Sequence, residues 1–265
     1  MQVDLHIHST ASDGTWTPPE VVAAALAAGL GAIAVTDHDS VANVAATHEL
    51  AAAAGLKFIP GAEICSTKDD FCFHILGYGI DVTNKRLLDL LEHNERLLNS
   101  KDDESIKMLI ERGWPLDFEE FLRYDYDRRR GGWKALAFLQ DKGLCGDVND
   151  FFSRIFTKEH DLGFPVFPSI KEVVDAIHAA GGVAFYARMQ PAVFMGRGWQ
   201  RHCWNWRRRI LMGLNVTIRD TAGKILRHCS LIAASISFLS AAAVTATAVL
   251  CRHVRWAGLL STAAT

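Results

Sequence analysis

Several features that are common in other protein classes are missing from this sequence of 265 residues. No Cys-x-x-Cys pair occurs among the six cysteines, and the N-terminus carries no basic-then-apolar export signal. We therefore expect free thiols and a cytoplasmic location. Internal repeats and low-complexity linkers are also absent. With 49% hydrophobic and 22% charged residues, the composition excludes a disordered chain, a collagen-like repeat and a disulfide-dependent miniprotein.

Acidic residues are almost absent from the last 78 residues of the chain. Residues 188–265 contain 11 of the 28 lysines and arginines, but no glutamate and a single aspartate, Asp220. They also hold four of the seven tryptophans. This change of composition divides the chain into two parts, and the patterns that indicate a function lie in residues 1–187.

The first 80 residues alternate between predicted strands and predicted helices. Short apolar runs predict strands at 3–8, 31–36, 58–64 and 71–78. Ala-rich helices are expected at 17–28 and 41–54; the first opens with a capping box, Thr17-Pro-Pro-Glu20. This alternation predicts an α/β fold with parallel strands.

An all-helical region interrupts the alternation. The sequence predicts a long charged helix over 84–112 and shorter helices at 117–123, 132–141 and 147–156. We interpret 95–165 as a helical insertion in an α/β domain formed by 1–94 and 166–187. A second capping box, Ser169-Ile-Lys-Glu172, begins a helix to about residue 180, and a strand is expected at 182–187.

Two histidines stand at the end of the first predicted strand. Because residues two apart on a strand face the same side, the imidazoles of His6 and His8 can reach one metal ion. Asp13 follows in a Ser-Asp-Gly turn that can bring its carboxylate back over the site. Taken singly, Asp13 and Asp39 are equally plausible as turn residues or helix caps.

Metal-capable side chains also follow the next three predicted strands. Sites in α/β folds form at the carboxyl ends of parallel strands, so we expect these side chains around one opening. Mixed imidazole and carboxylate ligands suit Zn, Mn or Fe. Glu63 can bridge two metals, and paired metals suit phosphoester hydrolysis. The predicted ligands are His6, His8, Asp13, His38, Glu63 and His74.

Five motifs together resemble those of the PHP (polymerase and histidinol phosphatase) family of metal-dependent phosphoesterases. They are His6-Ile-His8-Ser, Ser12-Asp-Gly14, Thr36-Asp-His-Asp39, Gly61-Ala-Glu63 and His74-Ile-Leu-Gly-Tyr. The resemblance covers about residues 1–187, and the most similar branch is the stand-alone enzymes that act on nucleotides and short RNA. It implies a distorted (β/α)7 barrel with a helical insertion and a site for two or three metal ions.

The resemblance also implies a role for each ligand. His6 and His8 would bind one metal together with Glu63, and Asp13 and His38 would bind a second. Glu63 would bridge, and a third metal would be held by the histidine of the fourth strand, His74. A metal-activated hydroxide would then attack the phosphoester, which makes Asp13, His38 and Glu63 the catalytic residues.

Further residues are candidates for supporting roles. Asp37 and Asp39 are expected to orient the histidine ligands. Substrate phosphate needs arginine or lysine, which Arg130 and Lys134 could supply, although a solvated charged surface explains the same residues. We expect a phosphorylated small molecule or a short RNA as the partner, with no reading of DNA sequence and no membrane contact.

Three ligands that the family implies do not appear after residue 187. The family has a histidine after the position of Ala187 and a later Ser-Asp-x-His motif, whereas this chain continues with Arg188. Joining the third base of each codon to the first two of the next allows histidine at 188–189 and Ser-Asp-x-His within 240–248. We therefore interpret 188–265 as an aberrant, out-of-frame segment. The expected function is hydrolysis of nucleotide-type phosphomonoesters or short 5′-phosphorylated RNA, impaired in this chain.

Two alternatives remain beside this interpretation. The substrate could be histidinol phosphate. The protein could also be a non-catalytic metal-binding module with a membrane tail, because Ser230–Leu250 is an uncharged run flanked by Arg227 and Arg252. Its richness in Ala, Ser and Thr makes it a weak membrane span.

Overall fold

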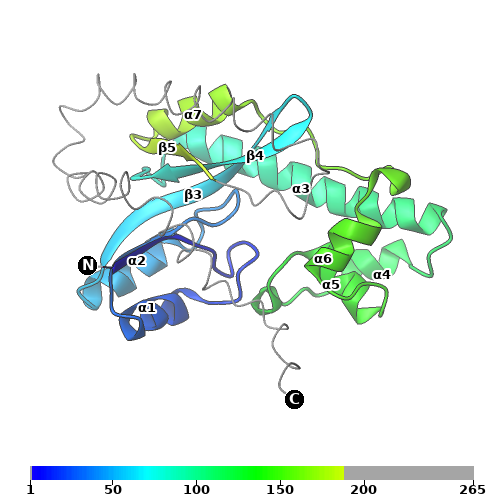
Figure 1. Cartoon of the computed structure of the whole chain (residues 1–265), viewed down its shortest axis with the longest axis horizontal. Helices are drawn as coiled ribbons and strands as arrows, with labels where there is room; N and C mark the ends of the chain where they lie inside the picture. Colours follow the sequence, from blue (N-terminus) through cyan, green and yellow to red (C-terminus); the bar gives the residue numbers. More distant parts are fainter. Residues whose placement is uncertain (1, 188–265) are drawn as a thin grey trace, which may run out of the picture. The chain divides into compact units, whose positions relative to one another are not determined.

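The computed structural model describes residues 2–187 (Figure 1). The out-of-frame segment and the membrane tail predicted for 188–265 lie outside the described residues. Within 2–187, no helix combines the length and the apolar character needed to cross a bilayer.

Among residues 2–187, five strands form one sheet in sequence order, and all five were predicted. They are β1 (Gln2–Ile7), β2 (Leu30–Val35), β3 (Lys57–Lys68), β4 (Phe71–Tyr78) and β5 (Val183–Tyr186). The parallel pairing expected from the sequence holds for β1–β2 and β2–β3. It is wrong for β4, which pairs antiparallel with both β3 and β5. The reason is a two-residue turn at Asp69 and Asp70, both with positive φ, which makes β3 and β4 a hairpin.

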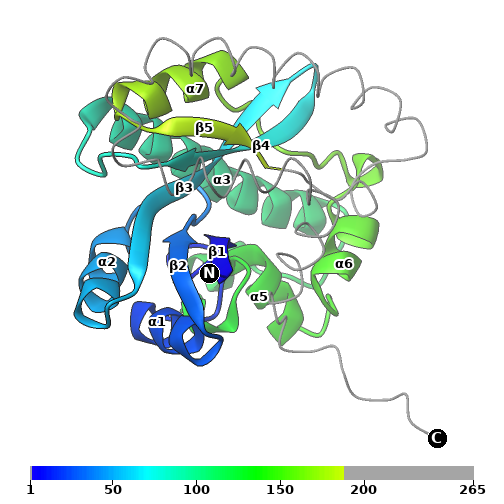
Figure 2. The same ribbon diagram turned by 60° about the vertical axis from the view of Figure 1, so that its left-hand side comes forward.

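Helices cover the sheet on two sides (Figure 2). Next to β2 and β3 lie α1 (Pro18–Ala27) and α2 (Val44–Ala53). On the other side, α7 (Ile170–Ala179) packs against β3, β4 and β5. Both predicted capping boxes are present, at Thr17 and at Ser169, so local hydrogen bonds fix where α1 and α7 begin.

The region between β4 and α7 is helical and has an apolar core of its own. Its longest helix is α3 (Lys85–Glu111), and α4, α5 and α6 gather around the C-terminal half of α3 (Figure 1). The others are α4 (Phe118–Arg123), η1 (Arg128–Arg130), α5 (Lys134–Asp141), α6 (Val148–Asp150), the π-turn η2 (Phe151–Ile155) and η3 (Lys158–His160). Ile106 and Leu109 of α3 pack with Phe121 and Phe138, all of them fully buried. Burial of each such side chain contributes about 1.5–3 kcal/mol to folding.

Asp102 links two helices of this region. The residue before α5, Trp133, provides no side-chain cap, and Asp102 of α3 accepts the backbone N–H of Ala135 at 3.1 Å instead. Burial raises the pKa of Asp102 to about 7, against the opposing effect of that hydrogen bond. The folded chain therefore holds this proton more tightly than the unfolded chain does, whose Asp pKa is about 3.9.

We predict that replacing Asp102 by asparagine changes how stability depends on pH. With the folded pKa above the unfolded one, the wild-type chain loses stability as pH rises from about 4 to about 7. Asp102→Asn keeps an acceptor for Ala135 and removes this loss, so its stability relative to wild type should rise by about 3 kcal/mol between pH 5 and pH 8. Urea unfolding at the two pH values measures the difference. Asp125→Asn, the same change of charge at an exposed position of the helical region, is the control, and an equal response of both variants would contradict the prediction.

Candidate metal centre

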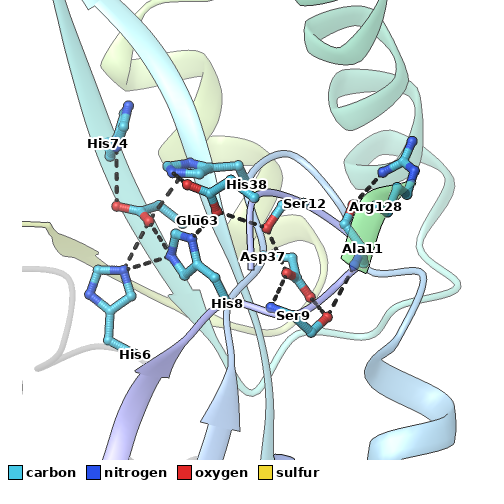
Figure 3. A network of polar contacts seen from close by, with 11 residues as sticks. His6, His8, Ser9, Ala11, Ser12, Asp37, His38, Glu63, His74 and Arg128 are labelled. Carbon is cyan, nitrogen blue, oxygen red and sulfur yellow. Dashed lines mark hydrogen bonds and ion pairs between the residues drawn. The ribbon is translucent and has the colours of Figure 1, made fainter. Parts of the chain in front are cut away.

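The six predicted ligands lie together in the structure. Figure 3 labels five of them, all except Asp13. They come from β1, the loop that follows it, the segment after β2, and strands β3 and β4. The expectation that each stands at a strand end is wrong for Glu63 and His74, which lie within β3 and β4. The β3–β4 hairpin continues past the site, so its interior rather than its end faces the ligands from β1 and β2.

The carboxylate of Glu63 is the centre of the cluster. Its Oε2 lies 2.9 Å from His6 Nε2 and 2.8 Å from His8 Nε2, and its Oε1 lies 3.2 Å from His74 Nδ1. The Nε2 atoms of His6 and His8 are 3.1 Å apart. Glu63 itself is only 3% exposed. Two imidazole nitrogens thus converge on one carboxylate oxygen, and a third faces the other oxygen.

Asp13 and His38 form the second side of the cluster. Asp13 Oδ1 lies 2.6 Å from His8 Nδ1, and Asp13 Oδ2 lies 3.9 Å from His38 Nε2. The ring of His38 packs edge-on against His8 and His74, with ring centroids 4.5 and 4.7 Å apart. His38 Nδ1 is buried without a hydrogen-bond partner, its nearest carboxylate oxygen being Glu63 Oε2 at 3.7 Å. A buried ring nitrogen without a partner is costly unless another group binds it.

Burial and charge act in opposite directions on these groups. Burial alone would raise the pKa of Glu63, but His38 and the other histidines hold it well below the usual range. For His8, burial disfavours the cation, yet Asp13 and Glu63 outweigh it and raise the pKa. His38 is different, because burial and the two neighbouring histidines lower its pKa to about 4. At neutral pH the site therefore has ionised carboxylates and a neutral His38 imidazole.

These donors fit divalent transition metals. Three groups of side chains each bring three donor atoms within 4.8 Å of one another: His6, His8 and Glu63; His8, Asp13 and His38; His38, Cys65 and His74. Mixed nitrogen and oxygen donors suit Zn, Mn and Fe. Cys65 was expected only as a free thiol. The signal that could have revealed it is its position two residues after Glu63, on the same face of β3.

Asp37 holds the loop between two ligands and does not contact a histidine ring. Its fully buried carboxylate accepts the Ser9 backbone N–H at 2.7 Å, the Ser9 hydroxyl at 2.6 Å and the Ser12 hydroxyl at 2.6 Å (Figure 3). Ser9 and Ser12 lie between His8 and Asp13 in the chain. Asp37 therefore fixes the loop that carries these two ligands.

Asp39 likewise binds backbone and amide groups rather than an imidazole. Its Oδ1 accepts the Cys65 N–H at 3.1 Å and the Asn94 side-chain amide at 2.7 Å. The expected hydrogen bond from a histidine ring to Asp37 or Asp39 is absent among residues 2–187. Asp37 is engaged by the two serines of the loop after β1, and Asp39 stands in a turn with a φ of +45°, which explains the difference.

The basic residues predicted to bind phosphate are engaged elsewhere. Both terminal nitrogens of Arg130 donate to Asp141, at 2.8 and 2.7 Å, and Lys134 donates to the Leu122 carbonyl at 3.1 Å. No hydrogen bond or ion pair of the described residues joins either side chain to the six ligands.

The helical region nevertheless reaches the loop that carries Asp13. Arg128 donates to the carbonyl of Ala11 at 3.1 Å (Figure 3). Gly132 donates its N–H to the carbonyl of Asp13 at 2.9 Å. A Cβ atom on Gly131, whose φ is +72°, would lie 2.9 Å from that same carbonyl, so glycine permits the close approach.

Comparison with known proteins places this architecture in a family. The model of the PHP domain matches residues 4–186. The chain is 30% identical over 188 residues to the 5′-3′ exoribonuclease Rnm of Escherichia coli, covering 69% of this chain and 64% of that protein. It is 40% identical over 191 residues to the 3′,5′-nucleoside bisphosphate phosphatase of Chromobacterium violaceum, covering 70% of this chain and 66% of that protein. The chain thus spans slightly less than two thirds of the length of these relatives.

A solved structure shows the same fold. An amidohydrolase from Chromobacterium violaceum, with bound sulfate and no metal, superimposes with a TM-score of 0.66 at 26% identity. The match covers 82% of this chain and 74% of the other. The family model, the relatives and the converging ligands agree, and the chain belongs to the PHP domain family.

Proposed function

We propose that this chain is a metal-dependent phosphoesterase. The proposal rests on the position of the Glu63 carboxylate. Its Oε2 faces His6 and His8, and its Oε1 faces His74. A carboxylate with donors on both oxygens suits a bridge between two ions, and paired ions suit phosphoester hydrolysis. The enzymatic activities named for the relatives support the same reaction class.

The ligands of this chain would be distributed among the ions as follows. His6, His8 and Glu63 would hold one ion, Asp13 and His38 a second, and His74 with the other Glu63 oxygen a third. Divalent ions, when bound, lower the pKa of the attacking water and neutralise the phosphate oxygens. Neutral His38 can bind an ion without first losing a proton, whereas His8 and His74, whose pKa values are raised, must release theirs. No side-chain nucleophile is required.

The substrate class we propose is a nucleotide-type phosphomonoester or a short 5′-phosphorylated RNA. One relative is named for a nucleoside bisphosphate and another for RNA. Arg128 brings positive charge to the loop of Asp13 through its contact with Ala11, and Arg130 and Lys134 follow it closely in the chain. We propose that Arg130 and Lys134 bind substrate phosphate after exchanging their present partners, and that the enzyme acts in the cytoplasm.

A substrate panel tests the proposal. The full chain, stripped by a chelator and reloaded with Mn, Zn or Fe(II), should release phosphate from a nucleoside 3′,5′-bisphosphate or from a 5′-phosphorylated oligoribonucleotide. Because the Ser-Asp-x-His motif is missing from the sequence, we expect slow turnover. Preference for histidinol phosphate would identify the alternative phosphatase. Metal retained without hydrolysis of any substrate would contradict the enzymatic proposal and favour a non-catalytic module.

Glu63→Gln should abolish most of the metal-dependent activity. Glutamine keeps the size of the side chain but removes the charge that offsets the neighbouring histidines and the ions. Changes in groups that only orient ligands cost about 10–100-fold in affinity or activity, so loss of this central ligand should cost more than about 100-fold. Phosphate release and bound metal are measured together. Glu49→Gln, the same change on the exposed face of α2, should leave both unchanged.

Asp37→Asn should weaken metal binding through the loop that it holds. Asparagine retains one acceptor oxygen but places an amide N–H₂ where a carboxylate oxygen now accepts from serine, so the loop carrying His8 and Asp13 should loosen. We expect metal affinity to fall about 10–100-fold, with kcat recovering at saturating metal. Asp69→Asn, at the exposed β3–β4 turn, is the control. An unchanged metal affinity for Asp37→Asn would rule out this positioning role.

A further inference from the structure

Cys65 faces the metal centre from the strand that carries Glu63. It lies two residues after Glu63 on β3, and residues two apart share one face of a strand. In the β3–β4 register, Cys65 stands directly opposite His74. Side chains directly opposite each other on an antiparallel pair lie about 4.5–5.5 Å apart at Cβ. Both rules place the thiol beside an expected ligand.

The thiol has two imidazoles within metal-binding reach. The donor atoms of His38, Cys65 and His74 all lie within 4.8 Å of one another. Tetrahedral zinc bonds of about 2.0–2.3 Å would place such atoms about 3.5 Å apart, so only a small adjustment is needed. His38 also has a buried ring nitrogen without a hydrogen-bond partner. This group therefore contains an unpartnered donor as well as a sulfur.

The neighbours of Cys65 are polar, whereas a cysteine that only packs in a hydrophobic core has apolar neighbours. Cys65 is 4% exposed, and the carboxylate of Asp39 accepts its backbone N–H while leaving the other oxygen, Oδ2, without a partner. Cys145 offers the contrast within the same chain. It is buried in the apolar core of the helical region, where its Sγ donates to the carbonyl of Asp147 at 3.4 Å, and among residues 2–187 it belongs to no group of converging metal donors.

We propose that Cys65, with His38 and His74, forms a sulfur-containing donor set for a soft divalent ion such as Zn²⁺ or Fe²⁺. Because a neutral imidazole has one lone pair, His38 would bind this ion instead of the ion at Asp13. The inference rests on the metal centre of the proposed function and specifies its third position. On binding, the S–H bond breaks, its proton goes to water, and the sulfur lone pair binds the ion; no electron is transferred. Thiolate ligands select Zn and Fe over Mn, so this position would favour the softer metals.

Cobalt substitution tests the proposal without relying on activity. The full chain, loaded with Co²⁺, should show a sulfur-to-cobalt charge-transfer band in the near ultraviolet. Cys65→Ser should lose the band and one bound ion, while the ions held by His6, His8, Asp13 and Glu63 remain. Cys145→Ser is the matched control and should keep the band. Cys72→Ser should keep it too; a band lost in Cys72→Ser but kept in Cys65→Ser would overturn the assignment.

X-ray absorption at the zinc edge of the unmodified chain tests the proposal even if a variant does not fold. A sulfur neighbour of zinc, retained in Cys72→Ser and Cys145→Ser, supports the proposal. Zinc surrounded only by nitrogen and oxygen overturns the assignment of Cys65. If phosphate is still released in that case, the proposed phosphoesterase function stands without a sulfur ligand. A chain that binds no metal under any condition would overturn both.

Discussion

The buried carboxylate of Glu63 is the interaction on which the rest of the site depends. Removing a carboxylate from water is costly unless charges or hydrogen bonds compensate it. Here the compensation comes from three imidazoles on two segments of the chain, at 2.8–3.2 Å. β1 brings His6 and His8 into place, and β4 brings His74. The register of the sheet therefore determines whether the charge of the buried Glu63 carboxylate is compensated.

The backbone of Glu63 holds the same segments together. Its N–H donates to the carbonyl of Asp37 at 3.0 Å, and its carbonyl accepts the N–H of Asp39 at 2.8 Å. These two bonds extend the parallel pairing of β2 and β3 beyond the end of β2 and fix the backbone on both sides of His38. A displacement of β3 would move both Glu63 and His38.

The helical region contributes to the site as well as to the fold. Asn94, on the first half of α3, donates to the Asp39 carboxylate and to the carbonyl of Cys65. Farther along the region, Gly132 donates its N–H to the carbonyl of Asp13. We infer that the helical region keeps the ligand loops in place, beyond any contact that it makes with substrate.

Local signals explain what the sequence could predict. The capping boxes at Thr17 and Ser169, the apolar strands and the spacing of His6 and His8 depend on neighbours within a few residues, and the structure contains each of these elements where expected. The convergence of the ligands from β1 and β2 also followed from the parallel pairing of these strands, whereas Glu63 and His74 reach the site from within the β3–β4 hairpin.

Long-range partners explain what could not be predicted. The antiparallel β4 depends on two aspartates with positive φ, which no apolar pattern reveals. Asp37 and Asp39 were expected to orient the histidine ligands, but the groups that they bind lie on the loop after β1, on β3 and on α3. Arg128 rather than Arg130 contacts the loop of Asp13, because the orientation of a one-turn helix decides which of three arginines faces it.

Locating the ions directly tests the central claim. Crystals of the full chain, soaked in Zn²⁺ and measured at the zinc absorption edge, would show each ion as an anomalous peak. We predict a peak between the Nε2 atoms of His6 and His8 and the Oε2 atom of Glu63, with a second near Asp13 and His38. Peaks confined to the protein surface, with this cluster empty at saturating zinc, would contradict the account.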